Sequence, residues 1–133
     1  MSPSSDKNLK ATIFDFCQAL SRNDLKTPLK FCTGDITLFW GPYEFIGRER
    51  VKRWIVELKE LFPILAYKEK SLKIQGNIAR QKIIFTFIMA AGHEGWLPCT
   101  ADYEFDDGLI KRINFQVSNG VLKFIREGSN IYL

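Results

Sequence analysis

Two periodicities divide this sequence, because helical spacing is confined to the part before Pro63 and alternating strand spacing follows it. Residues 64–117 form an almost continuous run of strands, interrupted by short turn sequences such as Asp107-Gly108. A long antiparallel meander that follows amphipathic helices folds into a curved sheet covered by those helices. The sequence therefore predicts an α+β fold: a cone-shaped roll with three N-terminal helices packed on a curved, mainly antiparallel sheet around an apolar hollow.

The three expected helices differ in the strength of their signals. Apolar residues recur at helical spacing over residues 8–20. A shorter helix is expected over residues 24–32, with Asp24 as its N-cap and Gly34 at its end. The third helix opens at Gly47 and stops at Pro63. Its apolar stripe comprises Val51, Trp54, Ile55, Leu58, Leu61 and Phe62.

The parity of side chains assigns the two faces of the expected sheet. The expected strands cover residues 36–40, 43–46, 65–75, 78–91, 97–105 and 109–117. The inward side chains of the two longest apolar strands are Ile83, Phe85, Phe87, Met89, Leu97, Cys99, Ala101, Tyr103 and Phe105. Parity breaks near Lys111-Arg112, which predicts a β-bulge that bends the sheet into a cup.

Length and composition are those of one soluble domain, with 133 residues, 46% hydrophobic and 26% charged. Residues 1–7 are expected to be disordered, residues 8–117 to form the domain, and residues 118–133 to form a C-terminal extension. No apolar run reaches the roughly 18 residues of a membrane span, and the N-terminus lacks the apolar segment of a secretory signal. A cytoplasmic protein without a membrane partner is expected.

The formal charge of +4 includes a local basic cluster at Arg48, Arg50, Lys52 and Arg53. These residues alternate with apolar ones on the expected third helix, which is the pattern of a solvated polar face. We therefore expect no nucleic-acid partner.

The cysteines, Cys17, Cys32 and Cys99, are odd in number, widely spaced and set among apolar neighbours. This pattern favours reduced thiols that pack as small hydrophobes. We expect no disulfide, no metal site and no cofactor.

Two short motifs carry a resemblance to a known family. Gly47-Arg48-Glu49 opens the third helix, and residues 103–110, Tyr-Glu-Phe-Asp-Asp-Gly-Leu-Ile, join the last two strands. With the order of elements, they resemble the nuclear transport factor 2-like superfamily, and within it the SnoaL-like branch, over residues 8–117. The resemblance implies the fold above. It leaves the activity open, because that superfamily includes ketosteroid isomerases, polyketide cyclases, dehydratases, epoxide hydrolases and members that only bind a partner.

The isomerase branch implies a register that can be tested residue by residue. In that register the helix tyrosine falls at Phe16, the general-base aspartate at Trp40 and the oxyanion-hole aspartate at Ala101. None of the three can move a proton or stabilise an oxyanion, so ketosteroid-isomerase chemistry is not expected. Register and parity together predict that the hollow is lined by Phe16, Trp40, Trp54, Phe85, Phe87, Cys99, Ala101, Tyr103, Phe115 and Val117.

Three polar residues are candidates for catalysis. His93 is the single histidine and is expected in a glycine-rich turn. Asp102 is expected on the convex face, and a register slip of one residue would turn it inward. Tyr103 is expected to face the hollow, where its hydroxyl group could orient a ligand or bond to a backbone carbonyl.

The sequence thus favours a pocket for a small hydrophobic or aromatic molecule. A cyclase, dehydratase or isomerase-like enzyme that uses Tyr103, Asp102 or His93 is one alternative, and a non-catalytic interaction module is another. Ile84, Thr86 and Ile88 are expected to point away from the helices. An exposed apolar strip of this kind is normally covered, so we expect a homodimer through the convex sheet face.

Overall fold

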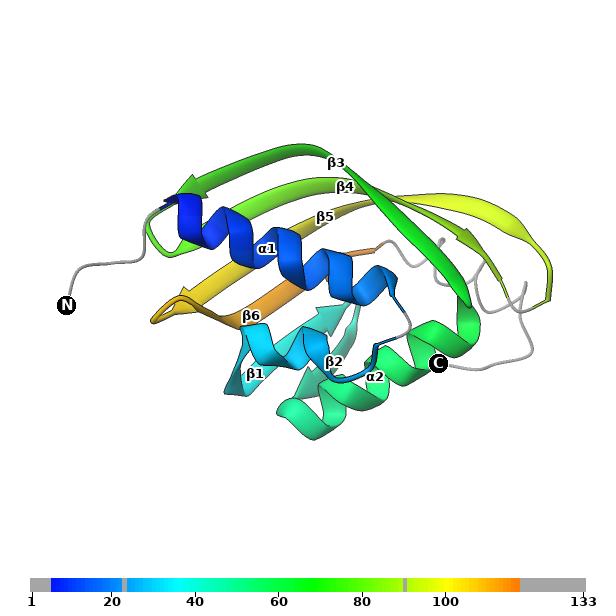
Figure 1. Cartoon of the computed structure of the whole chain (residues 1–133), viewed down its shortest axis with the longest axis horizontal. Helices are drawn as coiled ribbons and strands as arrows, with labels where there is room; N and C mark the ends of the chain where they lie inside the picture. Colours follow the sequence, from blue (N-terminus) through cyan, green and yellow to red (C-terminus); the bar gives the residue numbers. More distant parts are fainter. Residues whose placement is uncertain (1–5, 23, 90, 118–133) are drawn as a thin grey trace.

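The computed structural model describes residues 6–22, 24–89 and 91–117. Along the chain, its elements are α1 (Asp6–Ser21), the 3-10 helix η1 (Thr27–Phe31), β1 (Cys32–Trp40), β2 (Tyr43–Ile46), α2 (Arg48–Leu61), β3 (Ile64–Gln75), β4 (Ile78–Ile88), β5 (Glu94–Asp106) and β6 (Leu109–Gln116) (Figure 1). The segments expected to be a disordered N-terminus and a C-terminal extension lie outside this range, apart from residues 6 and 7, which belong to α1.

The strands form one curved sheet in the order β2-β1-β6-β5-β4-β3 (Figure 1). β1 and β6 run parallel, and all other neighbours are antiparallel. Both helices lie on one face, with α1 against β3 and α2 against β1 and β2. The prediction of an α+β fold with a curved, mainly antiparallel sheet is confirmed.

The prediction of three N-terminal helices is wrong, because the described residues contain two α-helices. Residues 24–32 hold the five-residue 3-10 helix η1 where an α-helix was expected. Asp24 does order this turn, since its carboxylate accepts hydrogen bonds of 3.0 Å from the backbone N–H groups of Lys26 and Thr27. Pro28 follows at once in the first turn and has no N–H to donate.

The 3-10 helix η1 ends at Phe31 because the next residues are paired in the sheet as β1. Cys32 already pairs with Ile110 of β6, so β1 begins four residues before the expected strand. Gly34 therefore lies inside β1, at an irregularity between Cys32 and Thr37, and does not end a helix. Tertiary pairing outweighs a short helical pattern here.

The loop between β4 and β5 lies three residues earlier in the chain than predicted. β4 ends at Ile88, which pairs with Glu94, so strand pairing replaces part of the predicted turn. The N–H group of Met89 donates to the His93 carbonyl at 2.7 Å and closes the loop. The predicted strand end at residue 91 and strand start at residue 97 are therefore corrected.

Parity and the bulge were predicted correctly. Inward positions of β4 and β5 are buried and alternate with more exposed ones. Glu104 pairs with Arg112 and Phe105 with Ile110, which leaves Lys111 as the extra residue of a bulge. The buried side chains form one core between the helices and the concave face of the sheet.

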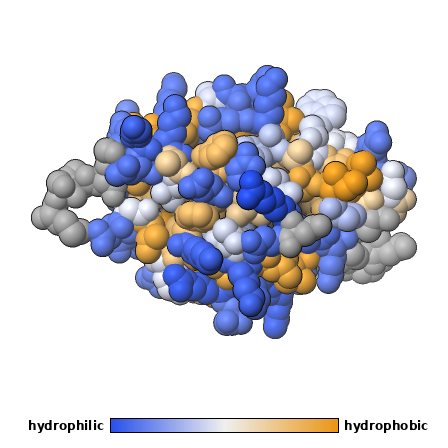
Figure 2. Space-filling model, in the orientation of Figure 1, coloured by the Kyte–Doolittle hydropathy of each residue, from blue (hydrophilic) through white to orange (hydrophobic). Residues whose placement is uncertain are grey.

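On the side of the molecule seen in Figure 2, hydrophobic residues form separate groups among hydrophilic ones. No helix in the described part of the chain is long and apolar enough to cross a membrane.

Candidate functional site

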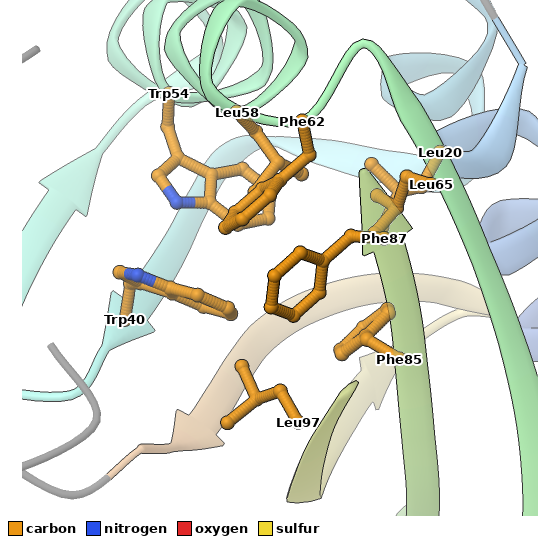
Figure 3. A pocket seen from close by; sticks show the side chains of 9 residues that line it. All are labelled: Leu20, Trp40, Trp54, Leu58, Phe62, Leu65, Phe85, Phe87 and Leu97. Carbon is orange, nitrogen blue, oxygen red and sulfur yellow. The ribbon is translucent and has the colours of Figure 1, made fainter. Parts of the chain in front are cut away.

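The candidate site is an apolar cavity between α2 and the concave face of the sheet. Its nine lining residues are Leu20, Trp40, Trp54, Leu58, Phe62, Leu65, Phe85, Phe87 and Leu97 (Figure 3). They come from both helices, from β1, β3, β4 and β5, and from the residue that caps α2. The two indole nitrogens are the polar side-chain atoms of this wall.

Periodicity explains why these side chains meet. Trp54 and Leu58 are four residues apart and therefore lie on the same face of α2. Phe85 and Phe87 are two apart in β4, and Phe85 pairs with Leu97 across the sheet. The same pairing places Leu65 of β3 beside Phe87.

Aromatic contacts hold the two tryptophans firmly. The ring centroids of Trp40 and Trp54 are 5.7 Å apart. Phe115 of β6 contacts both from behind, with its centroid 5.6 Å from Trp40 and 5.7 Å from Trp54. Phe62 and Phe87 form a separate pair, with their centroids 4.6 Å apart. Offset and tilted contacts at such distances are favourable.

The cavity is almost filled by its own walls. A volume of about 10 Å³ is left for the centre of a water molecule, which is room for roughly one water. In this conformation, the hollow expected from the sequence is occupied by side chains.

The structure brings only part of the predicted wall together. Trp40, Trp54, Phe85 and Phe87 line the cavity, and Phe115 supports it from behind. The other predicted residues are buried without lining it: Phe16, Cys99, Ala101, Tyr103 and Val117.

Sequence reasoning missed five lining residues: Leu20, Leu58, Phe62, Leu65 and Leu97. Their signals were present, since each belongs to an apolar helix stripe or to the inward face of a strand. The hydrophobic pattern does not reveal which of the inward side chains meet around the cavity.

Tyr103 is held in a buried polar cluster away from the cavity. Its hydroxyl group donates a hydrogen bond of 2.6 Å to Oε1 of Gln81, and the Sγ atom of Cys17 lies 3.6 Å from the same hydroxyl. Nε2 of Gln81 donates to Glu69 at 3.1 Å. Gln81 and Tyr103 are each 1% exposed. The sequence reasoning did not single out Gln81, although parity places it on the inward face of β4.

Burial keeps Tyr103 and Cys17 uncharged. It raises the pKa of Tyr103 well above its usual value, and the neighbouring Cys17 thiol contributes to the same effect. It also raises the pKa of Cys17 to about 11. Both groups are therefore neutral at pH 7, and neither is a ready base or nucleophile.

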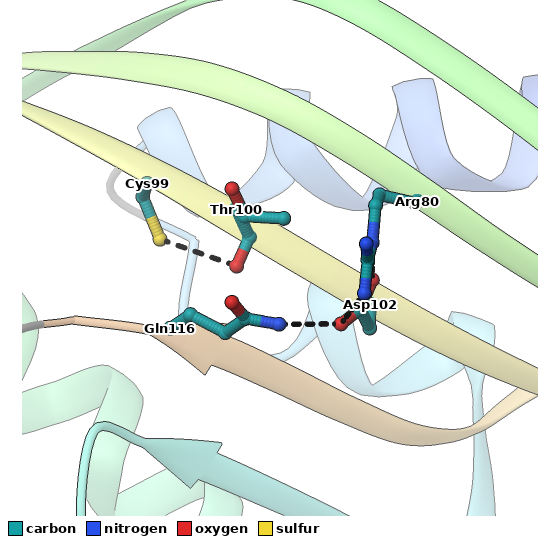
Figure 4. A network of polar contacts seen from close by, with 5 residues as sticks. All are labelled: Arg80, Cys99, Thr100, Asp102 and Gln116. Atoms are coloured by element: carbon teal, nitrogen blue, oxygen red, sulfur yellow. Dashed lines mark hydrogen bonds and ion pairs between the residues drawn. The ribbon is translucent and has the colours of Figure 1, made fainter.

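Asp102 lies on the face of the sheet opposite the helices. Its carboxylate accepts hydrogen bonds from Nε of Arg80 at 2.7 Å and from Nε2 of Gln116 at 2.6 Å (Figure 4). Cys99 also lies in β5 but on its inward face, where its thiol is buried and its Sγ lies 3.7 Å from the carbonyl oxygen of Thr100. Burial raises the pKa of Cys99 to about 12.

His93 is exposed in the loop between β4 and β5 and does not line the cavity. Within the described ranges, Tyr103, Asp102 and His93 therefore occupy three separate environments: the core, the convex face and a loop. The structure does not bring them together as a catalytic set.

The predicted basic cluster divides between two roles. Arg48 donates a hydrogen bond of 2.6 Å to the carbonyl oxygen of Cys32 and fastens the start of α2 to β1. Arg50, Lys52 and Arg53 share an open depression with Glu44 and Glu49, so this surface carries both signs of charge. No group of three or more potential metal ligands occurs among the described residues.

No protein-family model and no curated protein matches this sequence. Solved structures do match its shape. A nuclear transport factor 2-like protein of unknown function from Burkholderia pseudomallei superposes with a TM-score of 0.80 at 15% identity, over 95% of this chain and 97% of that one. A candidate SnoaL-like polyketide cyclase from a Jannaschia species gives a TM-score of 0.79 at 12% identity, over 94% and 96% of the two chains. The chain has the nuclear transport factor 2-like fold.

A third structure of this nuclear transport factor 2-like fold adds a bound molecule. It is a hypothetical protein with a ketosteroid isomerase-like fold from Catenulispora acidiphila, in complex with trimethylamine. Its TM-score is 0.74 at 11% identity, over 81% of this chain and 85% of that one. At such low identities the likeness establishes the fold, and the activity has to be argued from the residues of this chain.

Within the nuclear transport factor 2-like fold, the positions expected to align with isomerase catalytic groups are apolar and buried. Phe16 and Ala101 are fully buried in the core, and Trp40 lines the cavity. None of these side chains can act as a base or stabilise an oxyanion through a hydroxyl or carboxyl group.

Proposed function

We propose that this chain is a SnoaL-like domain that binds a small, uncharged hydrophobic or aromatic molecule in the apolar cavity. The observation that supports this proposal is the wall of the cavity, because its nine side chains present only apolar surface to the interior. Burying a ring against such a wall gains about 25 cal/mol per Å² of apolar surface. A charged group there would lose its hydration without a partner.

Ketosteroid-isomerase chemistry is not part of this proposal. The apolar side chains of Phe16, Trp40 and Ala101 support its absence, and so does the hydrogen bond that occupies the hydroxyl group of Tyr103. A cyclase or dehydratase role for Tyr103, Asp102 or His93 stays a prediction, which no contact within the described ranges favours. Cytoplasmic location and the absence of nucleic-acid, metal and cofactor partners also stay predictions.

The test is a fluorescence titration in a Trp96→Phe background, so that only Trp40 and Trp54 report. Nitrobenzene, a small aromatic quencher, is expected to quench them in a saturable manner, and toluene is expected to compete. Linear quenching with no effect of toluene would contradict binding in the cavity. The same protein is expected not to isomerise a model ketosteroid. If it does, Tyr103→Phe, Asp102→Asn and His93→Ala will show which group is essential.

An interaction role has its own supporting observation. The convex patch, which we define as Ile64, Ala66, Ile84, Thr86, Ile88, Trp96 and Pro98, runs across β3, β4 and β5. Trp96 is 68% exposed and Ile64 is 59% exposed. Exposed apolar groups in one patch mark a surface that another molecule covers.

We propose that this other molecule is a second copy of the chain. The rest of the convex face supports a self-complementary contact, because β4 carries the basic residues Arg80 and Lys82 and the neighbouring β5 carries the acidic residues Asp102 and Glu104, with Arg80 paired to Asp102. A two-fold axis that runs along the strands between β4 and β5 would place β4 of each copy over β5 of the other copy. The basic residues of β4 would then face the acidic residues of β5.

A further inference from the structure

Phe87 is one of the nine side chains that line the apolar cavity. In Figure 3 the ring of Phe87 lies in the middle of the lining residues, with Trp40 on one side and Phe85 on the other. The remaining volume is about 10 Å³. A cavity that binds benzene needs on the order of 150 Å³, so no ring compound enters unless a side chain moves.

The aromatic contacts indicate which side chain that is. Trp40, Trp54 and Phe85 all contact the ring of Phe115. In the part of the chain that the structure describes, the ring of Phe87 contacts one aromatic ring, that of Phe62. Phe87 also lies one residue before the end of β4, and Phe62 follows the last residue of α2. Among the described residues, Phe87 and Phe62 thus have fewer aromatic contacts than either tryptophan.

Gly95 provides the surface on which the Phe87 ring rests. The two residues are partners across β4 and β5. A Cβ atom built on Gly95 would lie 2.8 Å from Cζ of Phe87 and 2.9 Å from its Cε2, closer than side-chain atoms approach. The ring therefore lies directly on the main chain of Gly95. At Gly34, by contrast, an added Cβ would meet nothing within 4 Å.

We propose that Phe87 is a displaceable plug that holds the place of the ligand, and that Gly95 is its seat. This inference rests on the proposed binding function and deepens it. The ligand is a flat, uncharged ring of about the size of a phenyl group, which takes the place of the Phe87 ring between Gly95 and Phe62. The apparent affinity of the natural protein for this ligand equals the affinity of the open site multiplied by the fraction of molecules in which Phe87 leaves the site open.

The test compares toluene binding to the natural protein, to Phe87→Ala and to Phe105→Ala as a matched control. Phe105 is also a buried phenylalanine, but it does not line the cavity. The readout is the shift of the indole N–H resonances of Trp40 and Trp54 in a two-dimensional NMR titration. Phe87→Ala is expected to bind toluene at least tenfold more tightly than the natural protein, and Phe105→Ala with unchanged affinity at these indoles.

The possible results separate this inference from the proposed function. Equal affinity of folded Phe87→Ala and the natural protein would overturn the plug and leave ligand binding intact. Binding by Phe87→Ala alone would show that the ligand does not displace Phe87 in the natural protein, and it would overturn both the plug and the proposed binding. A gain of the same size in Phe105→Ala would also overturn the inference. If Phe87→Ala does not fold, Phe87→Leu removes the ring with less loss of packing, and the same comparison applies.

Discussion

The hydroxyl group of Tyr103 and the side-chain oxygen of Gln81 lie 2.6 Å apart in the core, where they join β5 to β4 by a buried hydrogen bond. The two residues are diagonal neighbours, since Gln81 pairs with Ala101 and Tyr103 with Ala79. This bond gives the inward tyrosine a structural role and keeps its hydroxyl group from the cavity.

Removing both partners of this bond should destabilise the protein by less than the sum of the two single removals. Tyr103→Phe or Gln81→Leu leaves a buried polar group without its partner, at a cost of about 1–3 kcal/mol in the free energy of unfolding. The double variant is expected to lose less than the sum of the two single losses. Urea denaturation of all four proteins measures this coupling. Strictly additive losses would show that the bond contributes nothing to stability.

Trp54→Ala should be among the most destabilising substitutions in the chain. Trp54 is 2% exposed and contacts Trp40, Phe45 and Phe115. Truncating a buried tryptophan costs about 3–5 kcal/mol. Urea denaturation gives the loss directly. A smaller loss combined with weaker toluene binding would mark Trp54 chiefly as a ligand contact, and no change in either would contradict its place on the inner face of α2.

Gly95→Ala should displace the Phe87 ring, while Gly34→Ala should have little effect. Both glycines lie in strands, but an added methyl group at Gly95 would collide with the Phe87 ring, whereas one at Gly34 would meet no atom within 4 Å. The expected signature is a changed aromatic NMR spectrum for Phe87 and a lower melting temperature in Gly95→Ala. In a Phe87→Leu background, most of this destabilisation should disappear. Equal effects of Gly95→Ala in the two backgrounds would show that the contact is unimportant.

Acid should weaken the turn that Asp24 organises. Hydrogen bonds from the Thr27 hydroxyl and from the N–H groups of Thr27 and Lys26 lower the pKa of Asp24 from 3.8 to about 2. The folded state binds the proton of Asp24 less readily than the unfolded state does. The contribution of the carboxylate to stability is therefore complete above its ordinary pKa, and it is lost as the pH falls through the lowered pKa of the folded state. Melting curves of the natural protein and Asp24→Ala should therefore converge between about pH 4 and pH 2. A difference that stays constant over this range would contradict the role of the carboxylate.

Trp96→Ser should dissociate the proposed homodimer. Trp96 is the most exposed large apolar residue of the convex patch. The matched control is Phe14→Ser, which removes a residue that is 56% exposed on α1, away from the sheet surface. Light scattering at micromolar concentration should find a dimer for the natural protein and for Phe14→Ser, and a monomer for Trp96→Ser. A monomeric natural protein would end the proposal.

Parity was a reliable guide wherever the core imposed it. Phe85 and Phe87 point inward and Thr86 points outward, because shifting a strand by one residue would expose its whole apolar set. The bulge at Lys111 was visible for the same reason, as a break in an otherwise regular alternation. The 3-10 turn after Asp24 was not visible, since the pairing of Cys32 with Ile110 joins residues far apart in the chain.

The sequence alone determined the two long helices and the order of the strands, the inward residues of the long strands and the apolar character of the hollow, because all three follow from local periodicity and hydrophobicity. Only the tertiary structure decided that Tyr103 bonds to Gln81, that Trp96 joins an exposed patch and that the Phe87 ring rests on Gly95. These relationships depend on register and packing between separate elements. A periodic pattern says which face a side chain occupies, but not which side chain it meets there.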